Sequence, residues 1–119
     1  MINLDTHILV YAVTGELRKR ENDLLAGDSW GISDIVLWEL AMLHQRGHID
    51  FDLSSPTIAT VLDAIHIFSV TAKIAQLSTE LDFNGDPADE LIAATSVVNR
   101  VPLVTRDRVI RKSKLVPLA

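Results

Sequence analysis

The chain has 119 residues, 48% of them hydrophobic and 23% charged, which is typical of a soluble globular protein. This length suits one domain with its own core, so we expect residues 1–119 to fold as a single domain. The absence of cysteine excludes disulfides, thiol catalysis and Cys-based zinc sites. The net charge of −5 argues against a simple basic clamp for nucleic acid. No segment resembles a signal peptide or a membrane span, so we expect a cytoplasmic protein with no membrane part.

Short apolar strands alternate with helices in the first half of the chain. The first strand is expected to end at Asp5, and an apolar helix follows it directly. Gly27 closes an amphipathic helix, and Ser33 is expected to cap a long one. The expected elements are a strand over 1–5, helices over 6–13 and 15–27, a strand over 29–33 and a helix over 34–48.

The second half continues this alternation. Asp86 and Pro87 are expected to begin a helix, because Asp is a preferred N-cap and Pro fits the first helical position. Such short strands, alternating with helices, indicate an α/β fold in which helices cover both faces of a parallel sheet. The expected elements are a helix over 56–64, a strand over 65–70, helices over 71–81 and from 87, a strand over 101–105, a short basic helix and an apolar end over 115–119.

Acidic residues gather where the strands of this sheet are expected to end. Asp5 and Asp107 follow the first and the last strand, and sites in open parallel sheets lie at the carboxyl ends of strands. Asp86 and Asp89 open the helix that leads into the last strand, so they reach the same edge only if the preceding turn carries the chain back across the sheet. Helix capping is the alternative role for each of these acids.

Glu39 lies on the apolar side of the helix expected over 34–48. Its neighbours three and four positions away are all apolar: Ile35, Val36, Met42 and Leu43. A carboxylate in such surroundings must be paired, protonated or bound to a cation. Clustered carboxylates are tolerated mainly when a divalent cation is present, and oxygen-only ligands favour Mg²⁺ or Mn²⁺ over zinc.

Four segments, "NLDTHILVYA", "WELA", "DPADELIAATS" and "LVTRD", occur in the order and rough spacing of a PIN-domain ribonuclease. They are especially similar to the VapC-type toxins of type II toxin–antitoxin systems, and the resemblance spans nearly the whole chain. It implies a single-domain α/β/α sandwich with a short, mostly parallel sheet. It also implies that the helix from Pro87 brings its acid to the shared edge.

The resemblance assigns a catalytic acidic quartet to Asp5, Glu39, Asp89 and Asp107. Metal binding is expected chiefly from Asp5, Asp89 and Asp107. Supporting roles fall to Thr6, Asp86 and Thr105. Glu39 is expected to bind the metal through water or to orient the nucleophile. Glu90 departs from the family pattern, because many relatives carry Arg there, and it adds negative charge beside the site.

The implied activity is that of a Mg²⁺- or Mn²⁺-dependent endoribonuclease. The cation would lower the pKa of a bound water that attacks an RNA phosphodiester, and it would neutralise charge on the leaving oxygen. The resemblance implies products with 5′-phosphate and 3′-hydroxyl ends. Guidance of the RNA backbone is expected from a basic cluster: Arg106, Arg108, Arg111 and Lys112. Contact with an antitoxin, a solvated helix face, or ion pairs from Arg106 and Arg108 to Asp107 are the alternatives for this cluster.

The main alternative function is a catalytically silent PIN-like module that binds protein or RNA. An aspartyl-phosphate phosphatase is a weaker alternative, because it would want a second Asp near Asp5, where the chain has Thr6 and His7. A zinc hydrolase would need more than His44 and His48, which lack the Glu of an H-E-x-x-H motif. No nucleophile elbow, P-loop or dinucleotide fingerprint is present.

The resemblance also implies partners. These are an RNA substrate such as tRNA or rRNA, a small cognate antitoxin, and a second copy of the chain in a homodimer. The apolar helix over 6–13 and the helix from Pro56 are candidate surfaces for the antitoxin or the second copy, with ordinary core packing as the alternative.

Overall fold

A parallel sheet forms the centre of the molecule in a computed structural model that describes residues 1–119. Its strands are β1 (Ile2–Leu4), β2 (Trp30–Ser33), β3 (His66–Phe68) and β4 (Leu103–Val104). All pairings are parallel, in the order β3-β2-β1-β4, and a parallel bridge from Leu103 to Leu118 extends the sheet beside β4. The predicted α/β fold with a short parallel sheet is therefore confirmed.

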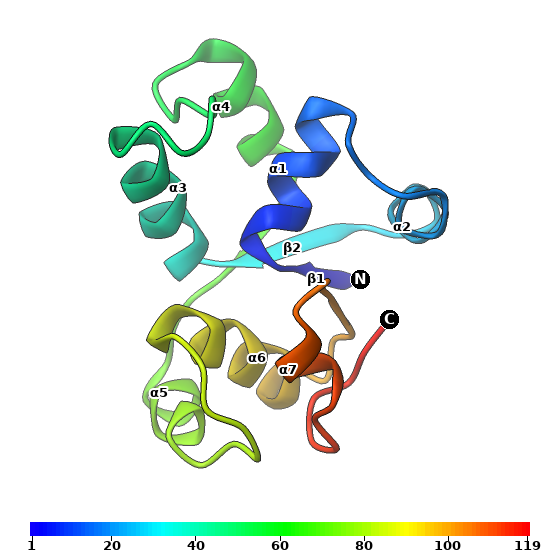
Figure 1. Ribbon diagram of the computed structural model, residues 1–119, viewed down its shortest axis with the longest axis vertical. Coiled ribbons are helices and arrows are strands. Elements are labelled where there is room, and N and C mark those ends of the chain that lie inside the picture. Colours follow the sequence, from blue (N-terminus) through cyan, green and yellow to red (C-terminus); the bar gives the residue numbers. More distant parts are fainter.

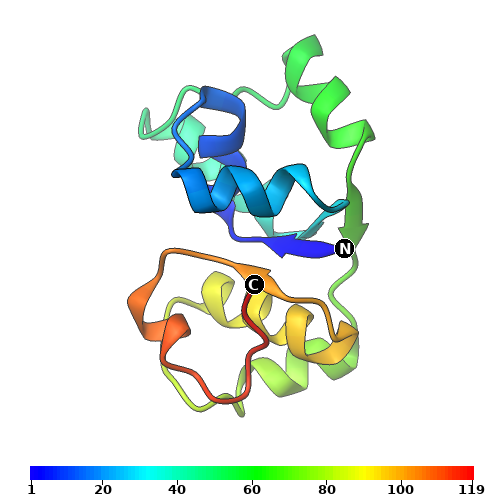
Figure 2. The same cartoon turned by 90° about the vertical axis from the view of Figure 1, so that its right-hand side faces the viewer.

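Helices cover both faces of the sheet. One face carries α1 (Thr6–Thr14), α2 (Lys19–Ala26), α3 (Ile35–Gln45) and α4 (Pro56–Asp63), as Figures 1 and 2 show. The other face carries α5 (Ala72–Ser78), α6 (Pro87–Asn99) and α7 (Arg108–Arg111). None of these helices combines the length and the apolar character needed to cross a membrane.

The predicted helices are present, but several begin or end elsewhere. Gly15 does not open the second helix: it adopts a left-handed conformation (φ 77°) and ends α1, a position that favours glycine. The third helix begins after Asp34 rather than Ser33, because Ser33 remains paired in β2 and the amide of Asp34 still donates to the carbonyl of Phe68 (2.9 Å). It ends at Gln45 rather than residue 48, just before the left-handed Gly47.

Apolar side chains from both layers meet on the sheet. Fully buried members of this core include Leu4, Leu9, Ile32, Leu40, Ile92 and Leu103. The helix predicted over 6–13 was a candidate surface for the antitoxin or the second copy. Most of it packs into this core instead, since Ile8, Leu9 and Val10 of α1 are buried. The burial of these three residues supports core packing, the alternative given for that segment.

The return of the chain across the sheet brings α6 to the carboxyl edge. After β3, α5 and the turn that follows it run back beneath the sheet, and α6 packs against both α5 and α3 (Figure 1). Leu4 and Val104 are register partners at the ends of β1 and β4. Residues that directly follow these strands therefore lie beside the start of α6.

Candidate active site

Four carboxylates from separate parts of the fold line one cleft at the carboxyl edge of the sheet. The cleft has a volume of about 440 Å³. Asp5 follows β1, Glu39 lies on α3, Asp89 lies in the first turn of α6, and Asp107 follows β4. The remaining lining residues are Thr6, His7, Met42, Leu43, Asp86 and Arg106. The structure thus brings together the four acids that the sequence pattern singled out.

Asp5 is buried at the junction of β1 and α1. It is the N-cap of α1, and its Oδ1 accepts a hydrogen bond from the amide of Thr6 (2.8 Å). Its Oδ2 accepts one from the hydroxyl of Thr105 (2.6 Å). Burial nevertheless raises the pKa of Asp5, because these two hydrogen bonds only partly replace lost hydration. Capping and a place in the cleft are therefore compatible roles for this residue.

Glu39 is half-buried and bound to the first turn of α1. Its carboxylate accepts a hydrogen bond from the hydroxyl of Thr6, so the residue after Asp5 also fixes the acid of α3. Burial raises the pKa of Glu39, and the nearby charge of Asp5 raises it further. No cationic side chain forms an ion pair with Glu39, and none of the residues on its apolar face supplies one.

The ionisation of Asp89 is strongly perturbed. Burial raises its pKa to about 7, and the charges of Asp5, Glu39 and Asp107 add to this effect. Its side chain is half-buried and makes no hydrogen bond to another residue. At neutral pH this carboxyl group is therefore poised between its protonated and charged forms.

Thr105 connects Asp5 to Asp107 through one hydroxyl group. While it donates to Asp5, the same oxygen accepts a hydrogen bond from the amide of Asp107 (3.0 Å). The carboxylate of Asp107 caps α7 by accepting from the amides of Val109 (2.8 Å) and Ile110 (3.1 Å). Asp107 thus caps α7, which is one of the roles predicted for it. The alternative role, ion pairs with Arg106 and Arg108, is wrong, because neither arginine pairs with Asp107.

Three further residues lie in or beside the cleft. Asp86 stands at the N-cap position of α6, as predicted, but its side chain makes no capping hydrogen bond and lines the cleft instead. Glu90, the departure from the family pattern, is half-buried and lies outside the cleft lining. His7 is exposed and lines the cleft, and its electrostatic interaction lowers the pKa of both Asp5 and Glu39 against the larger effect of burial.

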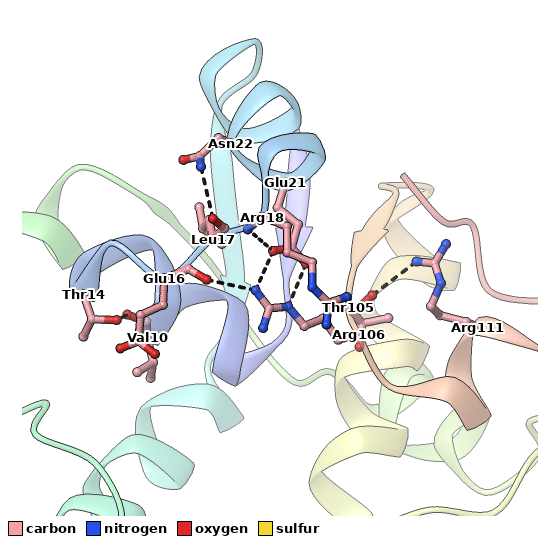
Figure 3. Close-up of polar contacts among 10 residues, drawn as sticks. All are labelled: Val10, Thr14, Glu16, Leu17, Arg18, Glu21, Asn22, Thr105, Arg106 and Arg111. Atoms are coloured by element: carbon pink, nitrogen blue, oxygen red, sulfur yellow. Dashed lines mark hydrogen bonds and ion pairs between the residues drawn. The ribbon is translucent and has the colours of Figure 1, made fainter.

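The four basic residues predicted to contact the RNA backbone lie in different surroundings. Arg106 lines the cleft, but its guanidinium binds both carboxylate oxygens of Glu21 (2.7 and 2.8 Å; Figure 3). It also lies 4.2 Å from the ring centre of Tyr11. Arg111 donates to the carbonyl of Thr105 (3.2 Å) and lines a second cavity. Arg108 and Lys112 are exposed and line neither cavity.

Glu21 was not singled out from the sequence. It is only 6% exposed, and the hydrogen bonds from Arg106 lower its pKa to about 2. Helical spacing could have indicated its burial from the sequence. Glu21 lies four residues from both Leu17 and Leu25, and both leucines pack into the core. That is the same pattern that drew attention to Glu39.

The donor set fits a hydrated divalent cation. Its members are carboxylates in a half-buried cleft, where burial raises the pKa of Asp89 and repulsion by the neighbouring acids raises it further. No three acidic or histidine side chains are arranged to ligate one ion directly. Mg²⁺ suits such a site, because it keeps several waters and takes only one or two carboxylates as direct ligands.

Comparison with known proteins gives the family. A model described as "PIN domain" matches residues 2–114. No curated protein matches significantly. A solved structure of VapBC2 from Rickettsia felis bound to a DNA fragment from its promoter contains a chain with 26% identity and a TM-score of 0.73, over 100% of this chain and 98% of that one.

Two other structures show the same fold. A chain of FitAcB from Neisseria gonorrhoeae has 19% identity and a TM-score of 0.68, over 99% of this chain and 96% of that one. A chain of a toxin–antitoxin complex from Klebsiella pneumoniae has 21% identity and a TM-score of 0.69, over 90% and 87%. Since the family match runs from β1 to beyond α7 and so includes every acid of the cleft, this chain belongs to the PIN-domain family.

Proposed function

We propose that this protein is a metal-dependent endoribonuclease and the toxin of a VapC-type toxin–antitoxin pair. The observation that carries the proposal is the convergence of Asp5, Glu39, Asp89 and Asp107 on one cleft, with the pKa of Asp89 raised to about 7. Such an arrangement destabilises the protein unless a cation or a proton neutralises it. The similarity to a chain of a toxin–antitoxin complex from Klebsiella pneumoniae and to a chain of VapBC2 from Rickettsia felis supports the biological role.

The role proposed for each acid follows from its contacts. Asp5, Asp89 and Asp107 would hold Mg²⁺ or Mn²⁺, with Thr105 fixing Asp5 and the backbone of Asp107. When bound, the cation would lower the pKa of water and neutralise charge on the phosphodiester. Glu39, oriented by Thr6, would accept a proton from the attacking water, and its raised pKa suits that task.

The proposed partners are an antitoxin and a second copy of this chain. The similar structures include a toxin–antitoxin complex from Klebsiella pneumoniae. On this chain, Ile58 is the one buried residue of α4, and Trp38 of α3 is 57% exposed. These half-covered helices are the proposed location of protein contacts, whereas α1 is largely used by the core.

Cleavage of RNA by the purified chain tests the proposal. We expect cleavage with Mg²⁺ or Mn²⁺, none with a chelator, and a loss of more than about 100-fold in Asp5→Asn and Asp89→Asn, since removal of outer partners alone often costs 10–100-fold. Asp63→Asn is the matched control, because Asp63 is exposed at the end of α4, away from the cleft. If the wild type and both variants were equally inert while a partner bound tightly, the protein would be a binding module.

A further inference from the structure

A second cavity lies beside the acidic cleft and collects positive charge. It has a volume of about 320 Å³ and is lined by residues that include Arg18, Arg20, Glu21, Thr105, Arg106 and Arg111. We call it the arginine pocket. Four arginines face one carboxylate there, although the chain as a whole carries a net charge of −5.

We propose that the arginine pocket binds a backbone phosphate of the RNA strand that is cut in the acidic cleft. The inference rests on the proposed ribonuclease function and names a second contact of the substrate. A planar guanidinium has five N–H donors and recognises phosphate oxygens in pairs, so several arginines around one concavity form a suitable site.

Most of the arginine donors in the pocket remain available. The side chain of Arg18 makes no hydrogen bond. Arg20 uses one nitrogen to donate to the carbonyl of Ala119 (2.8 Å), and Arg111 uses one to donate to the carbonyl of Thr105 (3.2 Å). All three side chains are exposed, so a phosphate can reach them from solvent.

The fourth arginine has a different role. Arg106 is neutralised by Glu21 and held over Tyr11, so its charge is already balanced. It lines both cavities and therefore lies between them. The net positive charge of the pocket thus comes from Arg18, Arg20 and Arg111.

The two cavities are adjacent, because Arg106 lines both. Thr105 also connects them: its hydroxyl binds Asp5 of the acidic cleft, while its carbonyl accepts from Arg111 of the arginine pocket. A ligand with phosphates in a regular row would place one at the acids and a neighbour at the arginines. A nucleic-acid backbone has this chemistry, and its phosphate contacts fix register without reading sequence.

The test compares the removal of two arginines of the pocket with the removal of the lysine that lies between them in sequence. Arg18→Ala combined with Arg20→Ala removes two arginines of the pocket. Lys19→Ala, between them in sequence, is the matched control, because Lys19 pairs with Asp23 (3.2 Å) on the exposed side of α2 and does not line the pocket. Both changes are made in the full chain carrying Asp89→Asn, so that RNA is bound without being cut.

Binding of a fluorescent single-stranded RNA, measured by anisotropy at several salt concentrations with a chelator present, gives the readout. We expect the double variant to bind about tenfold more weakly, with the slope of log K against log salt reduced by about 1 for each phosphate that the pocket no longer neutralises. The Lys19→Ala protein should bind like its parent. Equal losses of affinity in the double variant and in Lys19→Ala, or no loss in either, would overturn the proposal.

A second arm separates the pocket from other roles. In the cleavage-competent chain, the double variant should raise KM with little change in kcat, because the phosphate it contacts is not the one that reacts. If RNA affinity stays unchanged but affinity for the antitoxin falls, the pocket is a partner site and the proposal is wrong. If the wild type cleaves no RNA, the ribonuclease function fails, yet the binding comparison still decides the role of the pocket.

Discussion

Asp89 is the residue at which the ionisation of the cleft can be measured most directly. Its pKa in the folded chain is about 7, well above the ordinary value of 3.8. Between these two values the folded chain holds a proton that the unfolded chain has lost, so the stability contributed by protonated Asp89 is lost as the pH rises through this window. The cleft thus stabilises the metal-free protein less at neutral pH than at acidic pH.

The first prediction concerns removal of this charge. In the metal-free protein, Asp89→Asn should raise the melting temperature above that of the wild type at pH 8, because it relieves the repulsion by Asp5, Glu39 and Asp107. The difference should grow from pH 4 to pH 7 and then level off. Thermal unfolding with a chelator present measures it. A variant that is less stable than the wild type at pH 8 would contradict the prediction.

Thr105 gives the second prediction. Thr105→Val should reduce activity by about 10- to 100-fold, because it removes the hydroxyl that binds Asp5 and accepts from the amide of Asp107, and partners of this kind are typically worth that much. Thr105→Ser keeps the hydroxyl and should retain most of the activity. The comparison uses kcat/KM for RNA cleavage at saturating Mg²⁺. Equal losses of activity in both variants would show that the methyl group, not the hydrogen bond, matters.

The sequence was enough to single out some of the buried acids but not others. Glu39 could be predicted, because four apolar neighbours at helical spacing leave its carboxylate without water. Glu21 carries a similar signal, but its partner Arg106 lies 85 positions away along the chain. That contact depends on how α2 packs beside β4, which no local pattern contains.

At the scale of elements, the Glu21–Arg106 pair joins α2 to the turn between β4 and α7. That turn carries Thr105 and Asp107, so the pair also holds part of the acidic cleft in place. Glu21 accepts additionally from the amide of Arg18 (2.8 Å) at the start of α2. One buried carboxylate therefore fixes the start of α2 and the turn that carries Thr105 and Asp107.

The third prediction is a double-mutant cycle across this pair. Glu21→Ala and Arg106→Ala should show a coupling energy of about 1–3 kcal/mol in chemical unfolding at pH 7, as expected for residues of one ion-pair network. Since the pKa of Glu21 is lowered to about 2, this stabilisation is present at neutral pH and is lost only as the pH falls toward that value. Additive effects of the two substitutions at pH 7 would contradict a structural link.

Elements were easier to predict than their arrangement. Short apolar runs gave the strands, and Pro87 gave the start of α6. Strand–helix geometry places the start of α6 at the opposite edge unless the preceding turn carries the chain back across the sheet, and the family resemblance implied that it does. The order β3-β2-β1-β4 likewise depends on contacts between elements that are distant in sequence.

For the whole molecule, the acids of the cleft come from elements on both sides of the sheet. A cation bound there would connect α1, α3, α6 and the turn after β4. Binding to the folded state alone stabilises a protein by about 2.7 kcal/mol at 100 times the Kd. Metal binding should therefore raise the stability of the entire fold rather than of one loop.

The fourth prediction follows from this connection. Millimolar Mg²⁺ or Mn²⁺ should raise the melting temperature of the wild type, and the increase should be much smaller for Asp5→Asn and Asp89→Asn. Sodium chloride at equal ionic strength is the control for screening, and Asp63→Asn is the control for loss of an exposed acid. An equal increase in all of these proteins would mean that the cation acts elsewhere.

The chemistry of the RNA ends tests most directly whether the four acids form one metal-dependent hydrolytic site. RNA cut by the wild type with Mg²⁺ should carry 5′-phosphate and 3′-hydroxyl ends, because water is the proposed nucleophile and the 3′ oxygen the proposed leaving group, and Asp89→Asn should yield neither product. Mass spectrometry of a short substrate identifies these ends. Products with 2′,3′-cyclic phosphate, or identical cleavage by the wild type and Asp89→Asn, would contradict the proposed mechanism.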